Sequence, residues 1–149
     1  MSELFVPVLL TIITASTPLV FAAAGEVVVE KSGVLNLGVE GMMIVGAVIA
    51  FAVRVKTESA ALAIISGAAG GMLTAFIFGF LTLRLLANQV ATGLALTIFG
   101  LGLSALIGHG FVGKTFSGLP KIGVPFLEQI PVLGPLLFVH DILVYLSVI

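Results

Sequence analysis

The chain has 149 residues, of which 60% are hydrophobic and only 9% are charged, with a formal net charge of −1. Soluble domains carry about 25% charged residues, so this composition excludes an ordinary soluble protein, and its apolar content excludes a disordered one. The near-zero charge, with no basic cluster in the sequence, argues against nucleic-acid binding, and the lack of cysteine excludes disulfide frameworks and thiolate metal sites.

The first uncharged stretch, residues 4–25, predicts a membrane helix. About 20 apolar residues are needed to cross the roughly 30 Å hydrocarbon core, and this stretch ends before Glu26. The alanine triplet at 22–24 resembles a signal-peptidase site, but no basic residue precedes the apolar run and Glu3 has the wrong sign. We therefore predict a retained helix rather than a cleaved signal.

Three further spans are predicted at residues 34–53, 59–83 and 88–108. The second contains Glu40, which would lie only about 10 Å into the helix and so nearer one interface than the midplane. Small residues recur every four positions along the third and fourth spans, which allows close approach of helix backbones. We expect these ridges to pack inside the subunit; a seam between subunits is the alternative. The ridge residues are Ala63, Gly67, Gly71 and Ala75, then Gly100, Ser104 and Gly108.

After Gly108 the sequence is no longer a continuous apolar run. Residues 114–135 hold four prolines and predict an irregular loop, too broken to lie in lipid. The apolar tail is interrupted at His140 and Asp141, so we predict a fifth span that starts at about residue 136 or 142 and is unfinished at 149, as in a piece of a longer polypeptide. A complete span over 132–149 with a buried charge is the alternative.

The predicted fold class is therefore an all-α integral membrane protein, a single transmembrane region over residues 1–149 with four transmembrane helices plus an incomplete fifth. No catalytic, cofactor-binding or metal site is predicted. Residues 108–115 match the phosphate-binding pattern G-x-x-x-x-G-K-T, but that loop needs a preceding strand and a following helix, and neither is expected here. His109 and His140 have no paired ligands nearby.

Polar residues inside the predicted spans are the candidate functional residues, because ionisable and polar groups are costly in lipid. Asn36 and Glu40 are four apart and would share a helix face; a structural or interfacial role is the alternative for Glu40. For Asn88 and Gln89, capping of the fourth helix is the favoured alternative. The candidate pathway or gate residues are Asn36, Glu40, Asn88, Gln89, Thr92 and Thr97.

Four stretches carry a family resemblance. Residues 17–26 read TPLVFAAAGE, residues 33–43 read GVLNLGVEGMM, residues 87–96 read ANQVATGLAL, and residues 130–135 read IPVLGP. Together they resemble the permease subunits of ATP-binding-cassette importers, in the branch of simple-sugar, nucleoside and branched-chain amino-acid permeases. Residues 33–43 are the most specific, and the resemblance covers essentially the whole chain.

This resemblance implies an inner-membrane, multi-pass permease component that imports a small polar solute, a nucleoside or simple sugar, by alternating access. The implied partners are a second permease subunit, two ATPase subunits that hydrolyse ATP in place of this chain, and an external solute-binding protein. The family's cytoplasmic coupling segment does not occur before Ile149. Two alternatives remain: a small proton-coupled transporter that uses Glu40, and a non-transporting membrane scaffold.

The resemblance also implies an orientation. Residues 26–32 and Arg84 would be cytoplasmic, the loop 114–135 would face the binding protein outside, and Thr97 would lie nearest mid-span. Counting Lys and Arg gives two residues on the implied cytoplasmic side and four on the other, so the positive-inside rule favours the reverse.

Overall fold

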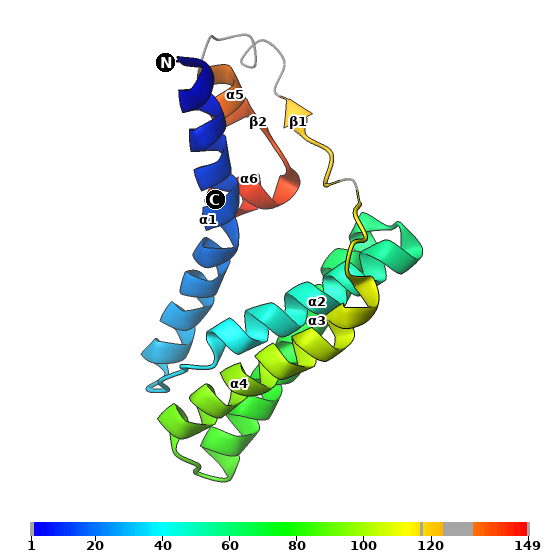
Figure 1. Cartoon of the computed structure of the whole chain (residues 1–149). Coiled ribbons are helices and arrows are strands. Elements are labelled where there is room, and N and C mark those ends of the chain that lie inside the picture. The colour runs from blue at the N-terminus through cyan, green and yellow to red at the C-terminus, as the bar shows by residue number, and fades with distance from the viewer. Residues whose placement is uncertain (1, 117, 124–132, 149) are drawn as a thin grey trace. The chain divides into compact units, whose positions relative to one another are not determined.

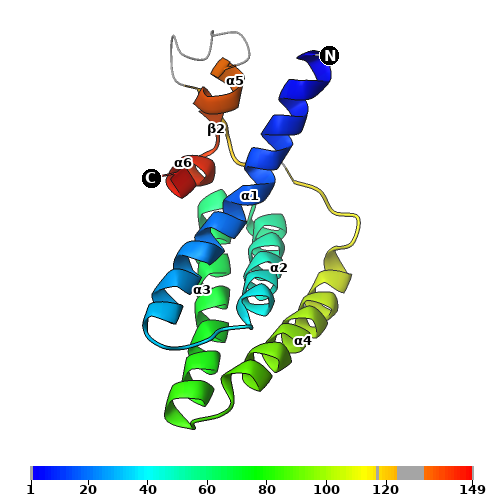
Figure 2. The ribbon, with the colours of Figure 1, turned by 90° about the vertical axis from the view of Figure 1, so that its left-hand side faces the viewer.

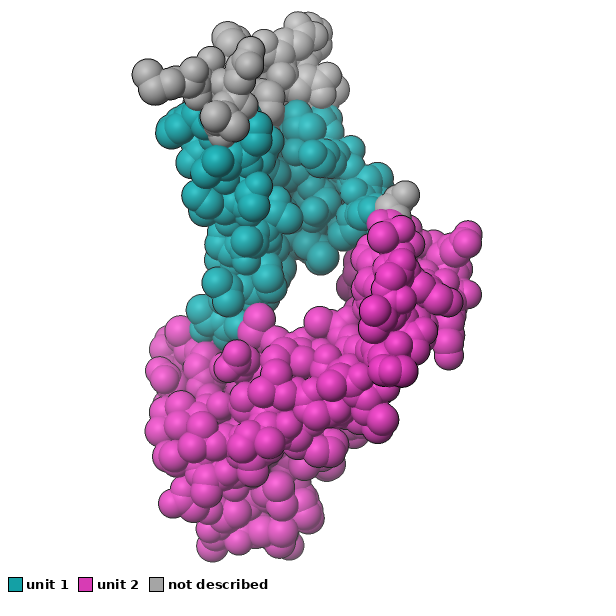
Figure 3. Space-filling view, viewed as in Figure 1, with its two compact units in different colours: residues 1–25, 118–149 teal, residues 26–117 magenta. Residues whose placement is uncertain are grey.

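The computed structural model describes residues 2–116, 118–123 and 133–148, which are mostly helical (Figure 1). They form two compact units, coloured separately in Figure 3: residues 26–117 are one, and residues 1–25 with 118–149 are the other. Helix α1 (Ser2–Lys31) runs through both units. Each unit is described by itself below.

The unit of residues 26–117 is a layer of helices in which α2 (Val39–Thr57) packs along both α3 (Ala60–Gly79) and α4 (Gln89–Gly108). Figure 2 shows α2 lying between the other two. A π-helical turn, Phe80–Arg84, ends α3, and a 3-10 turn, His109–Phe111, ends α4.

Small residues allow these helices to approach closely. A Cβ added to Gly67 would lie 2.8 Å from the Cβ of Ala50, and one added to Gly100 would lie 2.6 Å from the carbonyl oxygen of Gly41. The expected internal packing of the ridges is confirmed at these positions. Ala75, however, is exposed, because the buried face of α3 instead passes through Gly70 and Thr74.

The other unit holds the start of α1 and the C-terminal elements. Two-residue strands, β1 (Ile122–Gly123) and β2 (Val139–His140), pair antiparallel, with Ile122 opposite His140. Helix α5 (Leu133–Phe138) precedes β2, and α6 (Ile142–Val148) follows it. The Asp141 carboxylate accepts hydrogen bonds from the N–H groups of Leu143 and Val144 at 2.9 and 3.1 Å, so this residue caps a new helix and does not lie within a continuous one.

In the described part of the chain, three helices are long and apolar enough to cross a membrane: Phe5–Lys31, Ala60–Arg84 and Gln89–Phe111. Helix α2 has 19 residues but carries Glu40, Arg54 and Lys56. The expected count of four spans plus an incomplete fifth is therefore not confirmed, although the mostly helical membrane architecture is. Part of the expected proline-rich loop, residues 124–132, lies outside the described residues.

Candidate functional site

Helix α1 ends in a turn that requires a glycine. Gly33 has a φ of 82°, which residues with a Cβ adopt only at a cost. Its N–H donates to the Glu30 carbonyl at 2.9 Å, and the Val34 N–H donates to the Val29 carbonyl at 3.4 Å. This bond pair is a Schellman cap, and Val29 packs against the buried cluster that contains Val34. The turn leads into a non-helical linking segment, residues 34–38, before α2 begins.

Side chains accept hydrogen bonds from three main-chain N–H groups of the linking segment. The Glu26 carboxylate accepts from the Asn36 N–H at 3.2 Å and from its Nδ2 at 3.3 Å. Gln89 Oε1 accepts from the Leu35 N–H at 2.7 Å, and Asn36 Oδ1 accepts from the Gly38 N–H at 3.0 Å. A main-chain N–H left without a partner away from water costs about 1–3 kcal/mol, so these bonds offset the helical hydrogen bonds that this segment lacks.

A further bond joins this segment to α4. Thr97 Oγ1 donates to the Leu37 carbonyl at 3.2 Å, although the two residues are 60 positions apart. We use the name polar clasp for the side chains that hold the linking segment, namely Glu26, Asn36, Gln89 and Thr97. The clasp connects α1, the entrance to α2 and the first half of α4.

Glycine contacts reinforce the clasp. A Cβ on Gly93 would lie 2.9 Å from the main-chain nitrogen of Gly38, and a Cβ on Gly41 would lie 2.6 Å from the Leu96 carbonyl oxygen. Real Cβ atoms essentially never come so close to backbone. The start of α2 therefore rests directly on the α4 backbone, and any residue larger than glycine would separate them.

The structure brings three sequence-predicted candidates together, namely Asn36, Gln89 and Thr97. Asn36 is buried, but Glu40 is exposed in the first turn of α2. The prediction that these two share a helix face is wrong, because Asn36 precedes the helix. The sequence did not predict a role in the site for Glu26, which marked only the charged end of the first predicted span. No sequence signal indicated its role, because the contact with Asn36 depends on the turn at Gly33.

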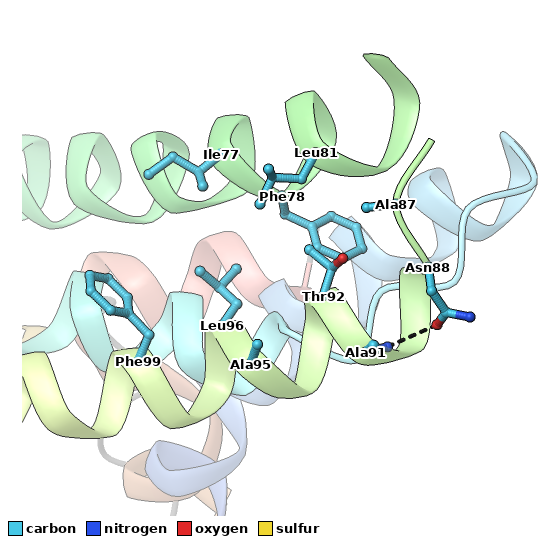
Figure 4. A pocket seen from close by; sticks show the side chains of 10 residues that line it. All are labelled: Ile77, Phe78, Leu81, Ala87, Asn88, Ala91, Thr92, Ala95, Leu96 and Phe99. Carbon is cyan, nitrogen blue, oxygen red and sulfur yellow. Dashed lines mark hydrogen bonds between the residues drawn. The ribbon is translucent and has the colours of Figure 1, made fainter. Parts of the chain in front are cut away.

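Asn88 and Thr92 lie elsewhere, at an open groove between α3 and α4 (Figure 4). Asn88 Oδ1 accepts from the Ala91 N–H at 3.0 Å, which confirms its capping role. Thr92 points toward Phe78. The groove has a volume of about 530 Å³ and an almost wholly apolar lining, so it suits hydrocarbon better than a polar solute. Its lining consists of Ile77, Phe78, Leu81, Ala87, Asn88, Ala91, Thr92, Ala95, Leu96 and Phe99.

The G-x-x-x-x-G-K-T match at residues 108–115 does not form a phosphate-binding loop. It begins at the end of α4 rather than after a strand, and residues 114–116 form no helix. The helix N-terminus that would bind phosphate is therefore missing there. In the ranges that the structure describes, no three His, Asp or Glu side chains are close enough to hold a metal ion.

Comparison with known proteins gives consistent matches. Residues 8–148 match the family described as branched-chain amino acid transport system / permease component. The chain is 38% identical over 141 residues to a putative glucose ABC transporter permease protein of Haloferax volcanii, covering 92% of this chain and 43% of the relative. It is 32% identical over 134 residues to the guanosine ABC transporter permease protein NupQ of Bacillus subtilis, covering 83% of this chain and 42% of the relative.

A nucleoside ABC transporter permease protein of Lactococcus lactis is 30% identical over 133 residues, again covering 83% of this chain and 42% of the relative. The chain thus spans less than half the length of each of these curated relatives. No solved structure matches it.

Proposed function

The chain belongs to the family of branched-chain amino acid transport system / permease components, and on this premise we propose that it is a membrane-spanning part of an ATP-driven importer for a nucleoside or simple sugar. The observation that carries the proposal is the 38% identity over 92% of the chain to a putative glucose permease. The guanosine and nucleoside permeases support the same solute classes. The composition and the three long apolar helices fit a multi-pass protein of the inner membrane.

The proposed mechanism is alternating access without covalent chemistry. Solute would arrive from an external binding protein and pass between this chain and a second permease subunit. ATP hydrolysis would take place in separate ATPase subunits, as expected for a permease component. A solute that is neutral and rich in hydroxyl groups can be passed along by exchanged hydrogen bonds, without a charged binding residue.

The polar clasp is the part of this chain best suited to a gate. It holds the linking segment to α1 and α4 through four hydrogen bonds, and hydrogen bonds between membrane helices average about 0.6 kcal/mol. Bonds this weak can break and re-form in each transport cycle. Asn36, Gln89 and Thr97 are the proposed gate residues, with Glu26 as the acceptor that orients Asn36. Glu40, Asn88 and Thr92 lie outside the clasp and remain secondary candidates for the pathway.

Uptake measurements test the proposal. Cells that lack the gene, with and without the restored gene, are given radiolabelled guanosine, glucose or leucine. We expect restoration to recover uptake of guanosine or glucose, and we expect this uptake to stop on ATP depletion but to survive a protonophore when ATP is maintained. Normal uptake of all three solutes without the gene would instead indicate a scaffold, and loss of uptake with the protonophore would indicate proton coupling.

A further inference from the structure

A cluster of cations and aromatic rings forms at the end of α2 remote from the linking segment. Phe51 of α2 makes edge contacts with Phe111 and Phe116, with ring centres 6.3 and 5.4 Å away. The ammonium nitrogens of Lys56 and Lys114 lie 5.8 and 6.0 Å from the centre of the Phe111 ring. Both cations therefore gather at one ring, although 58 positions separate them in the sequence.

The local backbone produces this arrangement. Gly113 has a φ of 77°, and the turn it allows lets the Lys114 N–H donate to the Phe111 carbonyl at 3.1 Å. This bond folds Lys114 back toward the ring. The Arg54 guanidinium lies 5.6 Å from the centre of the Phe116 ring. The cluster is thus formed by the last turn of α2 and the residues that follow α4.

Charge and depth distinguish this end of the helices. Positive charge predominates at this end, where Glu58 is the acidic residue near Arg54, Lys56 and Lys114. Negative charge predominates at the other end, which has Glu26, Glu30 and Glu40. Within the described residues, neither lysine forms an ion pair with a carboxylate. At 1.5 Å per residue the cluster lies about 25 Å along α2 from its start, which is close to the thickness of the hydrocarbon core.

Exposed apolar side chains adjoin the cations. Val112 is 81% exposed and Phe116 is 47% exposed. Contact with water would leave both apolar side chains unburied. An acidic protein surface could pair with the cations but would offer these side chains no apolar contact. A phospholipid offers both chemistries at the required depth, since its phosphate attracts juxtamembrane lysines and its acyl chains lie directly below.

We propose that this basic–aromatic cluster binds the phosphate headgroup of an anionic phospholipid. Lys56 and Lys114 contact the phosphate, the Phe111 ring holds their ammonium groups by cation–π attraction, and Val112 and Phe116 contact the acyl chains. The site is distinct from the polar clasp and does not depend on which solute is transported.

Native mass spectrometry of the purified chain tests the site. The chain is reconstituted in nanodiscs of equal parts phosphatidylglycerol and phosphatidylcholine, and the ratio of the two lipids retained is measured. The test variant is Lys56→Gln with Lys114→Gln. The control, Lys31→Gln with Lys121→Gln, makes the same change in charge at exposed lysines elsewhere. Arginine at positions 56 and 114 serves as the conservative replacement.

We expect retained phosphatidylglycerol to fall by roughly fivefold for each lysine removed from the cluster, to stay unchanged in the control and to persist with arginine. An equal fall in the control pair, or no fall in the test pair, would overturn the proposal. If the glutamine variant does not fold, the test uses the lipid ratio of the unmodified chain. That chain should retain more phosphatidylglycerol than phosphatidylcholine, and equal retention of the two lipids would overturn the proposal. Inorganic phosphate should fail to displace the lipid, and displacement would reassign the site to free phosphate.

Discussion

The carboxylate of Glu26 accepts hydrogen bonds from both the main-chain N–H and the side-chain amide of Asn36. The glycine turn at Gly33 reverses the chain between them and makes this pairing geometrically available. Asn36 Oδ1 also accepts from the Gly38 N–H. One buried side chain therefore links α1 to the start of α2 by hydrogen bonds. The consequences can be measured as stability and as transport.

Removal of the acceptor should destabilise the fold. Glu26→Ala leaves the Asn36 main-chain N–H without its acceptor and leaves Asn36 Nδ2 with only the Met42 sulfur, 3.8 Å away. An unsatisfied buried donor costs about 1–3 kcal/mol, so we expect a lower thermal unfolding midpoint by circular dichroism in detergent. Glu30→Ala, one turn further along α1 at an exposed position, is the matched control and should leave the midpoint unchanged. Equal effects from both variants would show that the clasp contributes nothing specific.

Two glycines on α4 give a sharper contrast. A Cβ on Gly100 would lie 2.8 Å from the Cα of Gly41, whereas a Cβ on Gly102 would meet nothing within 4 Å. Gly100→Ala should therefore cost about 1–3 kcal/mol by overpacking, while Gly102→Ala should be neutral or gain up to about 1 kcal/mol in helix propensity. Denaturant titration of both variants measures the difference, and a tolerated Gly100→Ala would mean that α2 and α4 are not in backbone contact.

The apolar runs predicted the long helices because a membrane span is a local property of composition. They placed the starts of the third and fourth helices within one residue of the observed ones. The entrance to α2 could not be predicted this way, since residues 34–38 are as apolar as the helix that follows. Their non-helical form depends on acceptors and donors at Gln89 and Thr97, more than fifty positions away. Glu26 was overlooked for the same reason, because its role depends on a turn and not on its neighbours.

Thr97 should contribute a small, measurable amount of stability and a larger effect on transport. Thr97→Val keeps the shape of the side chain but removes the bond to the Leu37 carbonyl, a loss of about 0.6 kcal/mol for an average bond between membrane helices. Thr115→Val is the control, because Thr115 is exposed, lies outside the clasp and the candidate pathway residues, and its hydroxyl makes no hydrogen bond within the described ranges. Solute uptake should fall in the first variant and not in the second; unchanged uptake in both would remove Thr97 from the proposed gate.

Membrane orientation is directly testable because the chain has no cysteine. Single cysteines at the exposed positions of Lys31 and Thr115 can be labelled with a membrane-impermeant maleimide in intact cells. The family resemblance places Thr115 outside, so we expect Thr115→Cys to react at once and Lys31→Cys to react only after permeabilisation. The opposite pattern would agree with the positive-inside count and would place the polar clasp toward the external surface.

Glu40 separates an ATP-driven importer from a proton-coupled transporter. Its side chain is exposed in the first turn of α2, where a negative charge favours the helix dipole by about 0.3–1 kcal/mol, so Glu40→Gln should cost little stability. An importer driven by ATP does not need this proton, and the variant should retain most of its uptake. Glu58→Gln, exposed just beyond the other end of α2, controls for the lost charge. A transporter that carries a proton on Glu40 would lose uptake completely in the first variant and keep it in the second, because only one of the two carboxylates would take part in the cycle.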